Sequence, residues 1–349
     1  MSLYPFPIEP REIQLIWGGD ALLRRYGKPG DAAAKIGESW ECWDRNRVSS
    51  GAYAGRTIAE LRMELGAELL GSLDPARMFP ILTKFIDARA ALSVQVHPDD
   101  AYAQRVEGQP NGKTECWLVL EAEPNATIVL GWNRSTSRTE FLERLKEGSL
   151  DDVLRRIPVR PGDAFYLPAG TLHAIGAGII LYETQQASDL TYRVFDYDRA
   201  GPDGKPRELH IEKAADVLDY RRCEAGALRS LEYVLDGLLR TTLVADRRFI
   251  FERVECAAQA RGLDLEGMPL AVTALDRGLE LEARGQATEL RPYQTALVPA
   301  ALDVVMVRAL GERARFLTAA PPSDREALPR RYARAAVPIE QSTDFLAQF

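Results

Sequence analysis

The 349-residue sequence contains few cysteines and few histidines, and this scarcity narrows the sites that it could build. The four cysteines are Cys42, Cys116, Cys223 and Cys256. They form no C-x-x-C pair, which argues against a cysteine-based zinc site and is typical of a reducing compartment. With only three histidines in the chain, any metal site must combine imidazoles with oxygen ligands.

Positive charge and long apolar runs are scarce as well. The 51 acidic side chains outnumber the 44 basic ones, and the net charge of −7 indicates neither nucleic acid nor an acidic membrane as a partner. No segment approaches the roughly 18 apolar residues of a membrane-spanning helix. Residues 1–7 carry no basic region ahead of an apolar core, so we expect a cytoplasmic protein.

The stretch from Leu92 to Asp100 carries the clearest pattern. Its alternation predicts a strand with three apolar side chains on one face and three polar ones on the other, namely Leu92, Val94 and Val96 against Ser93, Gln95 and His97. Because Gln95 and His97 stand two positions apart, an amide oxygen and an imidazole come within reach of a single metal ion. The strand should stop at Pro98, which cannot donate to a sheet.

Two further stretches carry residues of the same chemical kind. After the turn at Asn111-Gly112, a strand pattern resumes in which Lys113 and Glu115 share a face. Residues 162–173 fit the second motif of the cupin superfamily, G-x5-P-x-G-x2-H, without a gap. Its glycines and proline predict a tight turn that returns His173 into the mouth of a barrel.

The spacing of turns predicts a mainly β protein of about two domains. We expect a jelly-roll catalytic domain over residues 1–235, with inserted helices near 57–72 and 136–154 capped at Thr57 and Ser137. Residues 236–322 should form a smaller, degenerate cupin-like domain, and residues 323–349 a surface-bound or partly mobile tail. Since no histidine follows His210, the second domain cannot build the same metal site.

Taken alone, a histidine at the end of a strand is more often a hydrogen-bonded structural residue than a metal ligand. Here His97 and His173, two of the three histidines, fall at positions that the cupin pattern directs inward, which favours a metal site. His210 lies at the start of an expected helix over residues 209–220, away from these motifs. We interpret it as a structural or surface residue.

Over residues 10–215 the chain resembles the type I phosphomannose isomerases, the mannose-6-phosphate isomerase family. The motifs that carry the resemblance are Ile16-Trp17-Gly18-Gly19, Gly37-Glu38-Ser39-Trp40-Glu41, the stretch from Leu92 to Asp100, Gly112-Lys113-Thr114-Glu115 and Tyr192-Arg193-Val194-Phe195-Asp196-Tyr197. The resemblance implies a cupin fold and the interconversion of mannose 6-phosphate and fructose 6-phosphate. It also implies one Zn²⁺ per chain, with Gln95, His97, Glu115 and His173 as its ligands.

The resemblance also implies roles for six further residues. Glu183 and Arg193 match the active-site Glu and Arg of the family, and Lys113 is an auxiliary acid or hydroxyl contact. We favour Glu183 as the base, with a metal-bound water as the alternative, and Arg193 as a fixed positive charge. Ser93 and Lys84 match residues that bind the substrate phosphate. Arg199 stands where related enzymes carry a Lys and can still bind phosphate.

Two other classes of function remain open at this point. Two histidines and one Glu also describe the iron site of a cupin dioxygenase, which would need neither Gln95 nor the basic residues. A binding module that only sensed a sugar phosphate would have little reason to keep Glu183 and Arg193 together. We therefore expect a metal-dependent isomerase, monomeric or homodimeric, whose partner is a small sugar phosphate.

Overall fold

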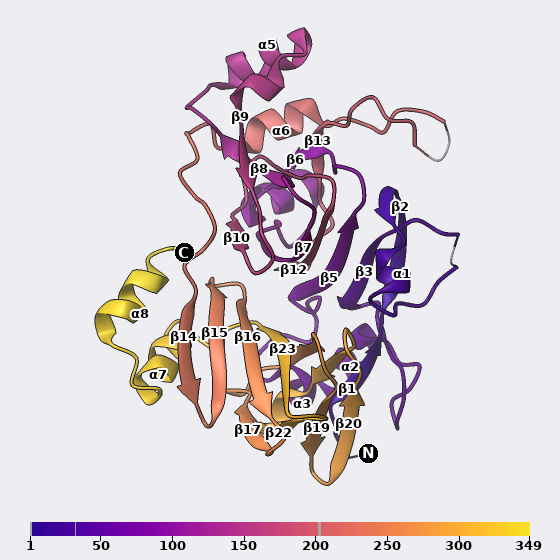
Figure 1. Cartoon of the computed structure of the whole chain (residues 1–349), viewed down its shortest axis with the longest axis vertical. Helices are drawn as coiled ribbons and strands as arrows, with labels where there is room; N and C mark the ends of the chain where they lie inside the picture. Colours follow the sequence, from indigo (N-terminus) through magenta and orange to yellow (C-terminus); the bar gives the residue numbers. More distant parts are fainter. Residues whose placement is uncertain (1, 32, 202–203) are drawn as a thin grey trace.

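The computed structural model describes residues 2–31, 33–201 and 204–349, which form antiparallel strands in four sheets (Figure 1). The expectation of a mainly β protein with a cupin-type fold is confirmed. Two sheets lie in the upper half of Figure 1 and two in the lower half. In the described part of the chain, no helix has both the length and the apolar character needed to cross a membrane.

The upper half is built from a six-stranded and a five-stranded sheet. The six-stranded sheet runs in the order β10 (Ala164–Leu167), β7 (Glu115–Ala122), β12 (Ile179–Gln186), β5 (Ile81–Ala88), β3 (Ile36–Cys42) and β2 (Arg11–Gly19). The five-stranded sheet runs in the order β13 (Tyr192–Phe195), β6 (Val94–Val96), β11 (His173–Ile175), β8 (Thr127–Trp132) and β9 (Leu154–Pro158).

The lower half pairs an eight-stranded with a four-stranded sheet. The larger sheet has the order β14 (Leu231–Leu235), β15 (Leu238–Ala245), β16 (Ile250–Ala257), β23 (Arg313–Ala320), β18 (Leu270–Ala274), β21 (Thr295–Val298), β1 (Phe6–Glu9) and β4 (Arg47–Val48). The smaller sheet has the order β17 (Arg261–Asp264), β22 (Val304–Ala309), β19 (Leu279–Ala283) and β20 (Gln286–Leu290). Strands β1 and β4 lie within the segment expected to form the catalytic domain. They nevertheless join the lower half, where β1 pairs with β21. The domain boundaries stay a prediction.

The two halves share one apolar core. Strand β12 is buried on both faces, and its side chains alternate between two environments. Tyr182 stacks on Phe251 of β16 with ring centroids 5.9 Å apart, and its hydroxyl pairs with Thr273 of β18 at 2.8 Å. Its neighbour Glu183 therefore points to the opposite face, into the upper half. One face of the six-stranded sheet therefore packs against the shared apolar core, and its opposite face lines the interior of the upper half.

The expected helical insertions are present, and their caps are as predicted. Thr57 accepts a hydrogen bond from the backbone of Glu60 in a capping box, and Ser137 accepts one from the backbone of Glu140. The helical segments are α1 (Ala21–Arg24), α2 (Ile58–Leu65), α3 (Ala67–Leu70), α4 (Asp100–Tyr102), η1 (Ala103–Glu107), α5 (Arg138–Glu147), η2 (Leu150–Val153), α6 (Ile211–Val217), η3 (Ala300–Leu302), α7 (Ala327–Arg334) and α8 (Ile339–Leu346).

The strand expected over residues 92–97 is shorter than its alternation predicts. It begins at Val94, and Val94 and Val96 join an apolar cluster with Phe141. Leu92 was predicted on the same face, which is wrong, because it lies ahead of the strand and packs in another cluster with Trp17. The alternation of side chains holds only where the backbone is paired in the sheet.

Residues 323–349, expected as a surface-bound or partly mobile tail, contain two helices. Helices α7 and α8 pack beside β14 (Figure 1), and Tyr332 and Phe345 are buried there. Arg331 of α7 reaches Glu252 of β16, with 2.8 Å between Nη1 and Oε2, and Arg240 lies 3.0 Å from the same oxygen. A buried carboxylate therefore fastens the C-terminal helices to the lower half.

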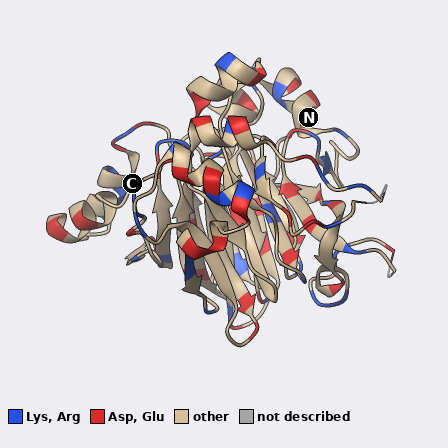
Figure 2. Cartoon of the chain, turned by 90° about the horizontal axis from the view of Figure 1, so that it is seen from above, with Lys and Arg blue, Asp and Glu red and all other residues tan. Residues whose placement is uncertain are grey.

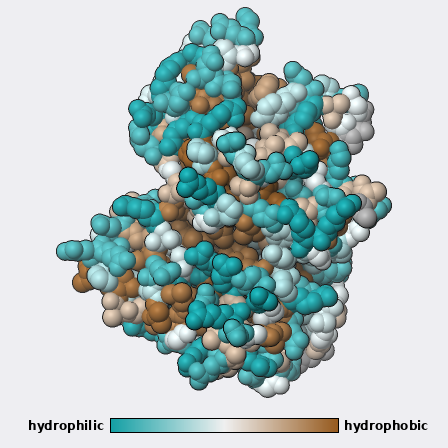
Figure 3. Space-filling view, viewed as in Figure 1, coloured by the Kyte–Doolittle hydropathy of each residue, from teal (hydrophilic) through white to brown (hydrophobic). Residues whose placement is uncertain are grey.

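The surface carries both signs of charge in mixture. Figure 2 shows basic and acidic residues interspersed along the helices and loops rather than gathered on one face. Figure 3 shows most of the viewed surface as hydrophilic, with apolar patches around the junction of the two halves. The mixture agrees with the small net charge of −7.

The buried ion pairs of Glu252 make a stability prediction. Burial alone would raise the pKa of Glu252, but Arg331 and Arg240 outweigh burial and lower the pKa to about 2. We expect Glu252→Gln to lower the free energy of unfolding at pH 7 by about 3 to 5 kcal/mol, because buried Arg240 loses this counter-charge and Arg331 keeps Glu266 but loses Glu252. A lowered folded-state pKa stabilises above the ordinary value of 4.5, so this difference should shrink as the pH falls from 4.5 towards 2.

Urea denaturation measures this difference. The matched control is Glu255→Gln on the same strand, because the ion-pair partner of Glu255 is Arg313, whose side chain is largely exposed. This control should change the free energy of unfolding by less than about 1 kcal/mol. Equal effects of the two substitutions would contradict the prediction.

Candidate metal centre

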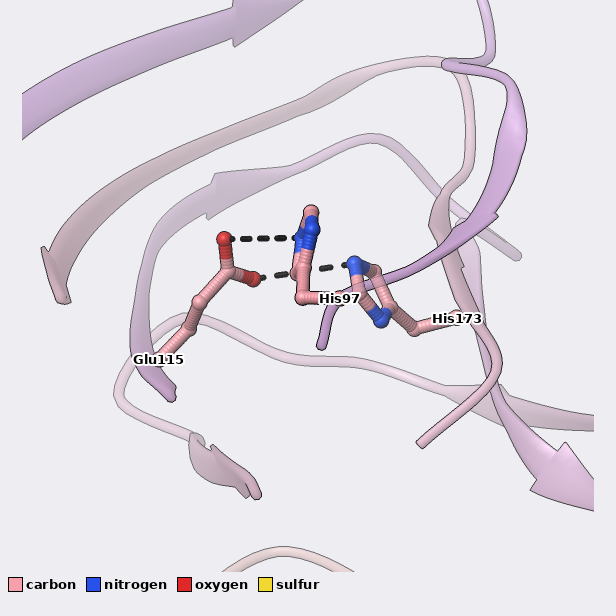
Figure 4. A group of neighbouring side chains, drawn as sticks. All are labelled: His97, Glu115 and His173. Atoms are coloured by element: carbon pink, nitrogen blue, oxygen red, sulfur yellow. Dashed lines mark ion pairs between the residues drawn. The ribbon is translucent and has the colours of Figure 1, made fainter. Parts of the chain in front are cut away.

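Three buried side chains converge in the upper half, between its two sheets. Figure 4 shows Glu115 facing His97 and His173. The Nε2 atom of His97 lies 3.2 Å from Oε1 of Glu115, and the Nε2 atom of His173 lies 3.6 Å from Oε2. The candidate ligand atoms of the three residues all lie within 4.8 Å of one another. One ion between them could contact all three.

Strand pairing explains why these residues meet. His173 opens β11 and stands opposite Gln95 of β6 in the five-stranded sheet, and His97 directly follows β6. Glu115 opens β7 in the facing six-stranded sheet. The N–H of Gly170 donates to the carbonyl of His97 at 2.9 Å, which ties the cupin turn to the end of β6. The centre therefore bridges the two sheets.

Backbone carbonyls orient both imidazoles. The Nδ1 atom of His97 lies 2.7 Å from the carbonyl oxygen of Leu190, and that of His173 lies 2.8 Å from the carbonyl oxygen of Thr171. Since a carbonyl only accepts, each Nδ1 carries the proton and each Nε2 presents a lone pair. Burial lowers the pKa of His97 to about 3 and lowers that of His173 as well. Both rings are thus neutral, as metal ligands must be.

Glu115 supplies the negative charge of the centre. Burial alone would raise its pKa, but its surroundings, above all the charge of Lys113, outweigh burial and hold the pKa well below its usual range. The ammonium of Lys113 lies 2.5 Å from Oε1. Neither oxygen accepts a well-aligned hydrogen bond from the described residues, although the side chain is only 1% exposed. A buried carboxylate whose Oε2 is left free by Lys113, beside two neutral imidazoles, fits a divalent cation.

Gln95 lies beside this group, with its amide nitrogen turned towards it. Its Nε2 is 3.2 Å from Nε2 of His173, and its Oε1 accepts a hydrogen bond from Ser93 at 3.3 Å. Ligation through the amide oxygen requires this amide to turn over. The hydroxyl of Ser93 can accept as well as donate, so it can also pair with the turned amide.

A second buried cluster lies around Glu183. Its Oε2 accepts a hydrogen bond from the indole N–H of Trp117 at 2.8 Å, and Lys84 lies 2.9 Å from Oε1. Burial and the nearby charge of Glu115 raise the pKa of Glu183, while Lys84 opposes that rise. Lys84 also lies 3.4 Å from Glu38, and these carboxylates raise the pKa of Lys84 against the effect of burial. The pKa of Glu183 is thus shifted in the direction that a general base needs.

A cleft of about 150 Å³ is lined by Glu183 and reaches the first cluster through Gln95 and Lys113, which contact His173 and His97. Its lining includes Lys84, Ser93, Gln95, Lys113, Trp117, Glu183, Arg193 and Arg207. Arg193 donates from Nη1 to the carbonyl of Glu208 at 3.0 Å, and its Nε is buried without an acceptor among the described residues. Burial and the charge of Arg207 lower the pKa of Arg193. A positively charged wall therefore flanks the cleft.

Arg199 lies beside this wall but does not line the cleft. It donates to the carbonyl of Ala91 at 2.6 Å and to Asp196 at 2.5 Å. The other arginine on Asp196 is Arg207, which does line the cleft. The proposed contact of Arg199 with phosphate stays a prediction.

The sequence patterns did not single out Arg207 or the hydrogen bond from Trp117. A signal for Trp117 was available, because it stands two positions after Glu115 on one strand and so shares its face. Arg207 follows an irregular loop, and no periodicity marks it. Of the ten predicted site residues, six line the cleft, three form the buried group next to it, and Arg199 lies outside both: these are Lys84, Ser93, Gln95, Lys113, Glu183 and Arg193, then His97, Glu115 and His173.

Comparisons with known proteins agree with this arrangement. Residues 6–124 match the family model for the catalytic domain of type I phosphomannose isomerase. The chain is 41% identical over 252 residues to the mannose-6-phosphate isomerase ManA of Bacillus subtilis (strain 168), an alignment that covers 70% of this chain and 77% of that protein.

Solved structures give the same result. A mannose 6-phosphate isomerase from Bacillus subtilis superposes with a TM-score of 0.82 at 31% identity, over 90% of this chain and 99% of that one. A zinc-bound mannose 6-phosphate isomerase superposes with a TM-score of 0.72 at 15% identity, over 91% and 99% of the two chains. The likeness to this second structure concerns the fold.

The geometry of the three converging side chains predicts which substitution removes a bound metal ion. We expect His173→Ala to lose the ion, because it deletes one of the two neutral imidazole donors. Elemental analysis of the purified variant measures the metal content. The control is His210→Ala, which removes the remaining histidine, at the N-terminus of α6, and should leave the metal content unchanged. Full metal content in His173→Ala would refute this assignment.

Proposed function

Because this chain belongs to the type I phosphomannose isomerase family, we propose that it interconverts mannose 6-phosphate and fructose 6-phosphate through an enediol. The observation that carries the proposal is that two buried clusters are neighbours, since Lys113 contacts the first and lines the same cleft as the second. One is the group of His97, Glu115 and His173, and the other is the Glu183 carboxylate with its Trp117 and Lys84 partners. An aldose–ketose isomerase needs both an electrophilic site and a base.

We assign Zn²⁺ to the first cluster, held by Gln95, His97, Glu115 and His173. Two imidazoles, one carboxylate and one amide oxygen form a mixed donor set that zinc accepts. When bound, the ion would supply a Lewis acid that polarises the oxygens of the substrate at C1 and C2. The zinc-bound mannose 6-phosphate isomerase of the same fold supports the choice of metal.

Glu183 is the proposed base that carries the proton between C1 and C2. Its raised pKa brings proton uptake closer to neutrality, where one carboxyl can both remove and return a proton. The indole of Trp117 and the ammonium of Lys84 hold one carboxylate oxygen each, which restricts the orientation of the group. Lys113 serves as an auxiliary acid or hydroxyl contact, 3.3 Å from His97.

Arg193 is the proposed stabiliser of the anionic charge that develops on the enediol oxygens. A guanidinium remains protonated, so it acts by its fixed charge rather than by proton transfer. The proposed contacts of the substrate phosphate are Ser93, Lys84 and Arg199. The basic wall near Arg193 and Arg207 supports an anion at that end of the cleft.

A coupled assay tests the proposed reaction. Purified protein should convert mannose 6-phosphate to fructose 6-phosphate and the reverse, lose activity with a chelator, and recover it when Zn²⁺ is added. The loss on chelation should exceed about 100-fold, because the ion contributes several kcal/mol of charge stabilisation. Absence of turnover by metal-loaded protein in both directions would overturn the proposal.

Separate substitutions distinguish the roles of base and metal ligand. We expect Glu183→Gln to keep its zinc and to lose about 10²- to 10⁴-fold in kcat, which is the usual contribution of a positioned base. Glu38→Gln is the matched control, because Glu38 also lies against Lys84 but receives no hydrogen bond from Trp117. This control should lose far less activity. Loss of zinc from Glu183→Gln would contradict the division of roles.

A further inference from the structure

Asp100 holds the loop that leads into strand β7. Its Oδ1 accepts a hydrogen bond from the backbone N–H of Gly112 at 2.8 Å and another from Nε2 of Gln186 at 2.8 Å. The Oε1 of Gln186 in turn accepts the N–H of Thr114 at 3.0 Å. One carboxylate oxygen therefore secures the backbone on both sides of Lys113.

The loop also lies directly on the backbone that follows His97. The N–H of Lys113 donates to the carbonyl of Pro98 at 3.0 Å. A Cβ added to Gly112 would lie 2.4 Å from that same carbonyl oxygen, so the close approach requires glycine. The loop has little room to move unless the bonds to Asp100 are broken.

The second oxygen of Asp100 faces a cation from the lower half of the molecule. Nη2 of Arg248, in the turn between β15 and β16, lies 3.8 Å from Oδ2. Asp246 fixes this guanidinium, with Nη1 of Arg248 3.3 Å from both carboxylate oxygens, and also accepts a hydrogen bond from the hydroxyl of Tyr166 at 2.8 Å. The arginine is thus held in place by residues of both halves.

We propose that Asp100 is a positioning residue for Lys113 and Glu115, and that Arg248 makes the lower half of the molecule part of this support. Asp100 touches neither the cleft nor the candidate ligands, and it acts through Gly112 and Gln186. The kinetic readout of this inference rests on the proposed function. Its structural readout does not.

Amide hydrogen exchange of the metal-free protein tests the structural part. Asp100→Ala should accelerate exchange at Gly112 and Thr114 by at least about tenfold. The amide of Gly112 loses its acceptor, and the amide of Thr114 loses the residue that holds its acceptor, Gln186. Asp100→Asn keeps an oxygen acceptor and should retain most of the protection. The control is Asp99→Ala, because the Asp99 carboxylate caps the N–H of Tyr102 and does not bond to the loop.

Metal affinity and kinetics test the consequence for the site. In Asp100→Ala we expect zinc affinity and kcat to fall by about 10- to 100-fold, the range for partners that support metal ligands, with KM changed less than about threefold. Asp100→Asn should restore most of the loss, whereas a general loss of folding would not be rescued in this way. Unchanged exchange at Gly112 and Thr114 in Asp100→Ala would overturn the proposal, whatever the kinetics.

Arg248→Ala tests the contribution of the lower half. It should weaken zinc binding severalfold in the wild-type background and have no further effect in Asp100→Ala, because the two residues act on the same loop. Additive effects would refute the role of Arg248. If wild-type protein turned over no sugar phosphate, the proposed function would fail, while hydrogen exchange and zinc affinity would still decide on Asp100.

Discussion

The two-residue alternation of side chains across the six-stranded sheet is the constraint on which the rest of the molecule depends. Tyr182 and Phe85 point into the apolar core shared with the lower half, while their neighbours Glu183 and Lys84 form a buried ion pair on the other face. A shift of one residue in the pairing of β12 would place the carboxylate in the apolar core. The packing of the two halves therefore also sets the register of the site.

The site keeps its ionisable groups buried by pairing them. Glu115 lies against Lys113 and Glu183 against Lys84, and all four side chains are nearly inaccessible to solvent. An unpaired charge at such a position is strongly destabilising, which limits the substitutions that these positions tolerate. The pKa values of the two carboxylates nevertheless shift in opposite directions, since Lys113 outweighs burial at Glu115, whereas burial and the charge of Glu115 outweigh Lys84 at Glu183. Two chemically similar groups are thus prepared for different tasks.

Local patterns predicted the parts of the structure that local interactions determine. The caps at Thr57 and Ser137, the shared face of Lys113 and Glu115, and the turn before His173 all depend on residues within a few positions of one another. The complete set of metal ligands followed from the resemblance to the family motifs. Residue spacing alone would have given separate groups of candidate ligands, without showing that they meet. Local patterns could not predict contacts whose partners lie far apart in the sequence. Arg331 meets Glu252 across 79 positions, and Leu92 changes environment because the strand starts two residues later than its alternation suggests.

The pairing of β1 with the lower half has a consequence for synthesis on the ribosome. Strand β1 lies between β21 and β4, and the hydroxyl of Thr288 donates to the carbonyl of Pro5 across 283 positions. At the usual rate of about 5 to 20 residues per second, some 15 to 60 s pass between the emergence of β1 and that of its partner β21. During that time the first apolar strand of the chain has no partner for one of its edges and is open to pairing with other chains. A segment that is made before the lower half is thus among the last to find its partner.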